Sequence, residues 1–219
     1  VVTVNDFREG NFRIATVGKP IADTEIKIAE DGEILVKGPQ IMMGYYKDPE
    51  LTAEVIKNGY FHTGDIGEVD KDGFLRITDR KKEMFKTSGG KYIAPQVLEN
   101  ALKQSRFIEQ LMVIGENQKM PAALIQPNWE FIAEWGKNKG LSLPTDLNAL
   151  SQHPKVIARI QKEIDLFNTK FGKWEQIKKF ELTPEVWSIE LGLLTPTMKM
   201  KRKVIKAHYQ ELIEKIYAE

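Results

Sequence analysis

Residues 59–95 read GYFHTGDIGEVDKDGFLRITDRKKEMFKTSGGKYIAP and carry the strongest structural signal in the chain. Two runs of strand-forming residues, 61–69 and 74–78, flank a Lys-Asp-Gly turn, so this part predicts a β-hairpin. A dense charge run over 79–83 comes next, and a helical pattern starts after a glycine-containing loop. The character of the sequence therefore changes at this charge run, which predicts two domains joined by a short hinge.

Upstream of this region the sequence is also rich in strand signals. Runs at 25–28 and 33–37 are joined through an Asp-Gly dipeptide, which accepts the positive φ angle of a tight hairpin turn. A helix of one or two turns is expected over 51–57, with Asp48 and Pro49 at its start.

Downstream of the charge run the hydrophobic pattern alternates between helical and strand periods. The expected elements are a helix over 95–104, strands over 110–114 and 122–126, a mainly helical segment over 128–174, a strand over 177–182 and a helix over 202–217. Asn128 is expected to cap the first helix of the helical segment, and Pro154 to start another.

These elements predict an α+β fold in two parts. Residues 1–79 are expected to form a small β-rich subdomain, and residues 80–219 a compact C-terminal sheet-plus-helices domain. The helical segment lies within the second domain.

Composition excludes several classes of protein. The 219 residues include 32 Lys and Arg against 31 Asp and Glu, so global charge gives no reason to expect a nucleic acid or an anionic membrane as partner. Cysteine is absent, which excludes disulfides, thiolate zinc sites and a cysteine nucleophile. Neither a membrane-spanning apolar run nor a signal peptide is visible, so a cytoplasmic location is expected, with association to a membrane left open.

Metal motifs are weak in this sequence. His62, His153 and His208 share no ligand spacing, so we interpret them as ordinary polar or capping residues. Residues 68–79 match a calcium-loop template in part, but the template positions at both ends carry unsuitable acids and the flanks alternate like strands. No metal ligand is therefore assigned in this chain.

Four motifs stand in a fixed order along the chain. They are GYFHTGD at 59–65, DRKKEMFK at 79–86, GGKYIAP at 89–95 and LTPTMKMKR at 194–202. Together they resemble the adenylate-forming superfamily, which includes acyl-CoA synthetases, peptide-synthetase adenylation domains and firefly luciferase. The DRKKE opening and the TPTMK form of the last motif look most like long-chain fatty acyl-CoA synthetases. The resemblance implies that residues 1–79 are the last subdomain of the N-terminal adenylating domain, that 80–219 form the mobile C-terminal domain, and that 128–174 is a helical insertion in it.

This resemblance implies an AMP-forming acid–thiol ligase. A fatty carboxylate would attack the α-phosphate of Mg-ATP to give acyl-adenylate and pyrophosphate, and the CoA thiolate would then displace AMP. ATP, Mg²⁺ and CoA are the implied cofactors, and a fatty acid is the implied substrate. Because the first step brings one anion up to another, the site must supply fixed positive charge.

The resemblance also implies roles for individual residues. Asp65 would accept hydrogen bonds from the ribose hydroxyls, and Arg80 would donate to the ribose. Lys82 occupies the hinge position, where the backbone turns to swing the C-terminal domain between two orientations. Without the resemblance, Asp65 reads as a turn residue and the two cations as part of a solvated charge run.

The thioester step is expected to use the next motif. Lys86 belongs to the face that the resemblance assigns to this step. Gly89 and Gly90 would let the pantetheine arm of CoA pass close to the backbone, because they lack a Cβ atom. A simple turn is the alternative reading of the two glycines.

Lys199 is the implied adenylation lysine, bridging the substrate carboxylate and ATP. Met198 stands where a glycine usually precedes that lysine, so Lys201 stays open as an alternative. Lys199 keeps the Lys-x-x-Arg spacing to Arg202, which favours it.

Part of the superfamily pattern is missing from this chain. Its Ser/Thr/Gly-rich phosphate loop and its aromatic-Gly-x-Thr-Glu segment do not occur, so the Mg²⁺ ligands and most of the acyl pocket are expected upstream. The chain is therefore expected to be a C-terminal fragment that is inactive alone. Two alternatives stay open: acyl transfer to a carrier protein, and a nucleic-acid-binding module built on the lysines of 81–91 and 199–206.

Overall fold

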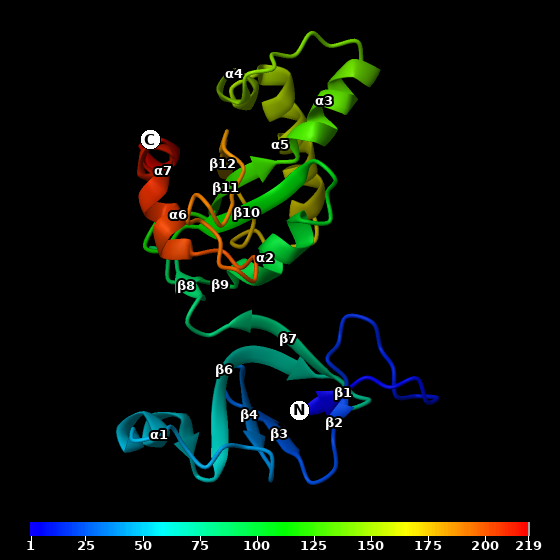
Figure 1. Cartoon of the computed structure of the whole chain (residues 1–219), viewed down its shortest axis with the longest axis vertical. Coiled ribbons are helices and arrows are strands. Elements are labelled where there is room, and N and C mark those ends of the chain that lie inside the picture. The colour runs from blue at the N-terminus through cyan, green and yellow to red at the C-terminus, as the bar shows by residue number, and fades with distance from the viewer. Residues whose placement is uncertain (219) are drawn as a thin grey trace. The chain divides into compact units, whose positions relative to one another are not determined.

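The structure is a computed structural model and describes residues 1–218. The chain divides into two compact units, Val1–Met84 and the part from Phe85 onward. Each unit has its own sheet, as Figure 1 shows. Each also has its own apolar core. The expected α+β class is confirmed.

The first unit is built on a sheet of five antiparallel strands. Its strands are β3 (Glu25–Ile28), β4 (Glu33–Lys37), β5 (Ile56–Lys57), β6 (Tyr60–Val69) and β7 (Leu75–Arg80). The order is β3-β4-β6-β5, and β7 also pairs with β6. Both predicted hairpins are therefore present, and they bury a small core of Ile34, Val36 and Leu75.

The helix of the first unit, α1 (Pro49–Val55), starts where the sequence predicts. The Asp48 side chain accepts a hydrogen bond of 3.0 Å from the Leu51 N–H and so satisfies one of the free donors at the helix start. The helix ends two residues earlier than expected, because Ile56–Lys57 pair with β6 as a strand. A further pair, β1 (Thr3–Val4) and β2 (Lys19–Pro20), was not predicted.

The second unit is built on the sheet β10 (Ile108–Ile114), β11 (Ala122–Pro127) and β12 (Lys179–Leu182). The first two strands are antiparallel, whereas β11 and β12 are parallel. A parallel pair needs a long crossover connection. The crossover is the expected helical insertion, with helices α3 (Trp129–Asn138), α4 (Leu147–Ser151) and α5 (Pro154–Asn168).

Both faces of this sheet are covered by helices. Leu111 and Val113 lie in one core cluster with residues of α2 (Pro95–Leu102), α3 and α5. Met112 and Ile114 point the other way, into a cluster with residues of α6 (Arg202–His208) and α7 (Gln210–Tyr217). Successive strand residues face opposite sides, so an unbroken apolar strand is what a doubly covered sheet requires.

The prediction of a single helix over 202–217 is wrong, because the structure has two helices there, α6 and α7, separated at Tyr209. Tyr209 leaves helical geometry there, with φ −108° and ψ 31°. Its ring is buried, and its hydroxyl donates to Glu185 at 2.6 Å. Both helices bury residues on the same side, so periodicity alone could not reveal the break.

Candidate functional site

The structure brings Asp65 and Arg80 together in the first unit. They are directly opposite each other at the end of the β6–β7 pair. The Arg80 Nε atom lies 2.7 Å from Asp65 Oδ1. Both side chains reach solvent, so the second carboxylate oxygen and the outer guanidinium nitrogens remain available to a ligand.

A buried carboxylate, Glu33, holds the backbone next to this pair. Only 4% of Glu33 is exposed. Its Oε1 accepts a 2.9 Å hydrogen bond from the Gly64 N–H, and its Oε2 lies 2.8 Å from Lys81 Nζ and 3.0 Å from His62 Nδ1. Three groups from the two motifs that contain Asp65 and Arg80 therefore converge on Glu33.

Sequence reasoning missed Glu33. Alternation along β4 predicts that Ile34 and Val36 point inward and that Glu33 does not. The register with β6 shifts between Glu33 and Leu35, and contacts with His62, Gly64 and Lys81 bury the carboxylate. A single sequence carries no signal for contacts between residues so far apart in the chain.

The charges of this network stabilise one another. Burial alone would raise the pKa of Glu33, but hydrogen bonds from Lys81, His62 and Gly64 lower it below its ordinary value of 4.5. The side-chain hydrogen bond from Lys81, which is 2.6 Å from Asp31, likewise lowers the pKa of Asp31. The same two carboxylates raise the pKa of Lys81.

The hinge residue predicted by the resemblance, Lys82, follows directly after this network. The Lys81 N–H still donates to the Gly64 carbonyl at 2.8 Å, which extends the β6–β7 pairing by one residue. The chain then turns, and the N–H groups of Glu83 and Met84 both donate to the Arg80 carbonyl. Lys82 is exposed in this turn, two residues before the division between the units.

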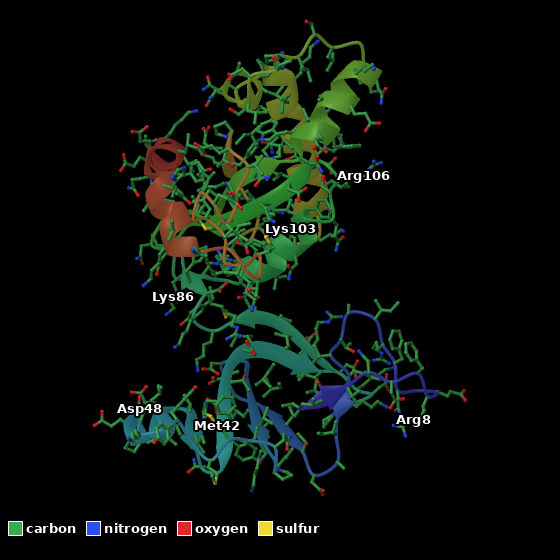
Figure 2. The ribbon with its side chains drawn as sticks, viewed as in Figure 1. Arg8, Met42, Asp48, Lys86, Lys103 and Arg106 are labelled. Atoms are coloured by element: carbon green, nitrogen blue, oxygen red, sulfur yellow. The ribbon has the colours of Figure 1, made fainter. Side chains whose placement is uncertain are left out.

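Lys86, Gly89 and Gly90 share one hairpin of the second unit, formed by β8 (Phe85–Lys86) and β9 (Tyr92–Ile93). Lys86 Nζ lies 4.5 Å from the centre of the Tyr92 ring and is labelled in Figure 2. Gly90 has φ +74°, which favours glycine, and a Cβ atom there would meet no atom within 4 Å. The loop tip therefore leaves open space beside its backbone, as the approach of a ligand requires.

Lys199 lies on a tight turn of the second unit. The Thr195 N–H donates to the Lys199 carbonyl at 2.8 Å, and the Lys199 N–H donates to Thr195 Oγ1 at 3.0 Å. Met198 has φ +60° in this turn, a left-handed conformation that residues other than glycine rarely adopt. Met198 thus adopts a conformation that glycine accepts without strain, directly before Lys199.

A buried ion pair fixes the chain directly after this turn. Arg202 Nη2 lies 2.5 Å from Glu99 Oε2, and Glu99 Oε1 accepts a 2.8 Å hydrogen bond from the Val113 N–H. Glu99 belongs to α2 and is 3% exposed. The start of α6 is therefore attached to both α2 and β10.

The acids of the calcium-loop template take part in an ion-pair cluster instead. Asp70 and Asp72 in the β6–β7 turn both pair with Arg13. Asp70 also accepts hydrogen bonds from the backbone of the same turn. In residues 1–218, no group of three or more His, Asp or Glu side chains is placed to hold a metal ion.

The chain resembles known proteins along almost its whole length. The family model described as the AMP-binding enzyme C-terminal domain matches residues 83–219. Long-chain-fatty-acid–CoA ligase FadD15 of Mycobacterium tuberculosis is 38% identical over 99% of this chain and 36% of its own length. Long-chain-fatty-acid–CoA ligase 1 of Homo sapiens is 35% identical over 95% of this chain and 32% of its own length. The chain thus spans about a third of the length of these curated relatives.

A solved structure has the same fold. The A domain of carboxylic acid reductase from Segniliparus rugosus, in complex with AMP and a co-purified carboxylic acid, matches with a TM-score of 0.71 and 26% identity. The match covers 92% of this chain and 32% of that one. The family-model match spans more than half of the residues and includes the motifs around Lys86, Gly89 and Lys199. The chain belongs to the family of the AMP-binding enzyme C-terminal domain.

Proposed function

We propose that this chain is the C-terminal part of an ATP-dependent long-chain fatty acid–CoA ligase. The observation that carries the proposal is the Asp65–Arg80 pair, which presents a carboxylate and a guanidinium side by side at 2.7 Å. The relatives at 35–38% identity are named long-chain-fatty-acid–CoA ligases, which supports a long-chain fatty acid as substrate and CoA as the thiol acceptor. Their greater length is consistent with an active site that needs an upstream region.

The proposed role of the pair is to bind the ribose of ATP. The free Asp65 oxygen accepts from ribose hydroxyls, and the outer Arg80 nitrogens donate to the ribose oxygens. Glu33 supports this geometry because it fixes Gly64 and Lys81, the neighbours of both residues.

Lys199 is proposed to supply positive charge for adenylation. A lysine on a compact turn places a mobile cation between the substrate carboxylate and the α-phosphate, where two anions must meet. Its turn is held by Thr195 and by the Arg202–Glu99 pair, so the backbone is fixed while the side chain is exposed.

The thioester step is proposed to use the β8–β9 hairpin of the second unit. The open space at Gly89 and Gly90 suits the pantetheine arm of CoA, with Lys86 on the same hairpin. The two steps need different orientations of the C-terminal domain, and Lys82 is the proposed pivot between the parts 1–79 and 80–219. Mg²⁺ is proposed to bind in the upstream region, and the enzyme is proposed to act in the cytoplasm.

The test is acyl-CoA formation by the chain joined to the upstream region of its full-length protein. We expect product only when ATP, CoA and a long-chain acid are all present, and none from the 219-residue chain alone. Acyl transfer to a carrier protein in place of CoA would contradict CoA as the acceptor and favour the carrier-protein alternative. Turnover by the chain alone would show that the upstream requirement is wrong.

A further inference from the structure

A cleft in the helical insertion combines an apolar floor with a ring of cations. It has a volume of about 370 Å³ and lies between α3 and α5, both labelled in Figure 1. Its lining includes Trp135, Lys139, Leu141, Lys155, Arg159 and Lys162. No acidic residue lines it, and none of these residues belongs to the ligase motifs.

The cations are arranged by the helix rather than scattered. Lys155, Arg159 and Lys162 follow one another at spacings of four and three residues, which places them on one face of α5. Ala158 also lines the cleft on this face, and its small side chain leaves room between the cations. The opposite face of α5 buries Ile160 and Ile164 in the core, so the basic face has a fixed direction.

Two of the lining side chains are held in place by the same aromatic ring. Phe107 contacts Trp135 edge-to-face at 5.9 Å between ring centres. The Arg159 guanidinium carbon lies 4.1 Å from the centre of the Phe107 ring, and Arg159 also pairs with Glu163. The aromatic floor and the central cation are therefore positioned before any ligand arrives.

The outer cations have no counter-ion in the part of the chain that the structure describes. Lys139, Lys155 and Lys162 are all exposed, and none of them lies within ion-pair distance of a carboxylate of residues 1–218. A ligand that brings an anionic group would complete the charge balance, and one that also brings an apolar part would cover Trp135 and Leu141.

We propose that this cleft binds the phosphate headgroup of an anionic phospholipid at a membrane surface. The phosphate lies among Lys155, Arg159 and Lys162, and the glycerol and first methylenes pack on Trp135 and Leu141. Tryptophan together with basic side chains is the combination that suits a membrane interface, because one end of such a site is apolar and the other is wet. Global net charge is +1, so the attraction is local to this cleft.

The test is sedimentation of the 219-residue chain with vesicles, which does not depend on ligase activity. Vesicles of phosphatidylcholine alone are compared with vesicles that also contain phosphatidylglycerol. The cleft variant is Lys155→Gln with Lys162→Gln, and the matched control is Lys137→Gln with Lys173→Gln. Both pairs remove equal charge from exposed positions of the same insertion, and the control residues lie outside the cleft lining.

Binding to the phosphatidylglycerol vesicles is expected to fall about 25-fold in the cleft variant, at about five-fold for each lysine near an anionic surface. Binding of the control variant to the same vesicles is expected to fall less than five-fold. An equal loss in both variants would overturn the proposal, since attraction would then follow net charge alone. Equal binding to neutral vesicles would overturn it as well. If inorganic phosphate at constant ionic strength released all of the chain from the vesicles, the lipid proposal would be overturned, and the ligand of the cleft would be a free phosphate ion. Because the ligase assay is separate, failure of either proposal leaves the other standing.

Discussion

Met198, which precedes the proposed adenylation lysine Lys199, has a strained backbone conformation. Its left-handed φ of +60° costs an L residue about 1–2 kcal/mol, and its side chain is 58% exposed, so it gains little packing in return. Met198→Gly should therefore raise the free energy of unfolding of the second unit by about 0.5–1 kcal/mol, after the entropy cost of glycine. Chemical denaturation measures this change.

Met198→Ala is the matched control for that prediction. It removes the same side chain but keeps the left-handed strain, so it should give no gain in stability. Equal effects of glycine and alanine would show that the turn is not strained at this position.

The buried carboxylate of Glu33 gives a second prediction for a single residue, on the stability of the first unit. Glu33→Gln removes a buried charge that faces Lys81 and His62, and it should lower the free energy of unfolding of the first unit by about 1–3 kcal/mol at neutral pH. Glu30→Gln, at an exposed position three residues earlier, should change it little. Urea denaturation of both variants compares the two changes.

The pH dependence follows from the direction of the pKa shifts. Folding lowers the pKa values of Glu33 and Asp31 below 4.5 and 3.8, so their stabilisation is present above those values and is lost as pH falls through the lowered ones. The loss of stability of the first unit in acid should therefore be smaller in Glu33→Gln than in the native chain. Identical acid profiles would contradict the assigned role of Glu33.

The sequence predicts the motif residues but not the buried carboxylates that position their neighbours. The pair Asp65 and Arg80 could be chosen from the family pattern, and the structure places the two side chains in contact. Glu33 and Glu99 could not be chosen, because both act through contacts distant in sequence, with Lys81 and Arg202. Tertiary contacts, rather than periodicity, accompany the burial of these carboxylates.

At the scale of elements, α5 connects the core of the second unit to its basic cleft. Ile160 is fully buried on the inner face of this helix. Ile160→Ala should destabilise the second unit by about 2–5 kcal/mol because it leaves a cavity. Leu166→Ala, on the same helix but 59% exposed, should cost less than about 1 kcal/mol. Denaturation followed by hydrogen exchange in each unit would locate the loss, and similar costs for both variants would contradict the packing described.

Elements with a one-sided pattern or a local signal could be predicted, and elements defined by tertiary contacts could not. The Asn128 side chain caps α3 as its position suggests, accepting from the Phe131 N–H at 3.0 Å. The division of the last helix at Tyr209 was missed, since a buried ring and its bond to Glu185 impose it. Strand β5 was read as the end of a helix for a related reason: its two residues take their conformation from pairing with β6.

At the scale of the whole molecule, the account depends on two units with separate tasks. The first unit holds the proposed nucleotide residues Asp65 and Arg80, and the second holds the proposed reactive lysine, Lys199. A reaction that needs both must bring the units into a defined orientation, and Lys82, in the turn after Arg80, is the proposed pivot.

Carboxylate-dependent exchange between ATP and pyrophosphate tests this account most directly, with the upstream region restored. It isolates adenylation, so it does not depend on the thiol acceptor. Exchange should rise with acyl chain length, fall by about 100- to 1,000-fold in Lys199→Ala and stay within about ten-fold of the native rate in Lys201→Ala. Loss of exchange in Lys201→Ala alone would contradict the assignment of Lys199, and no exchange with any acid would contradict the ligase itself.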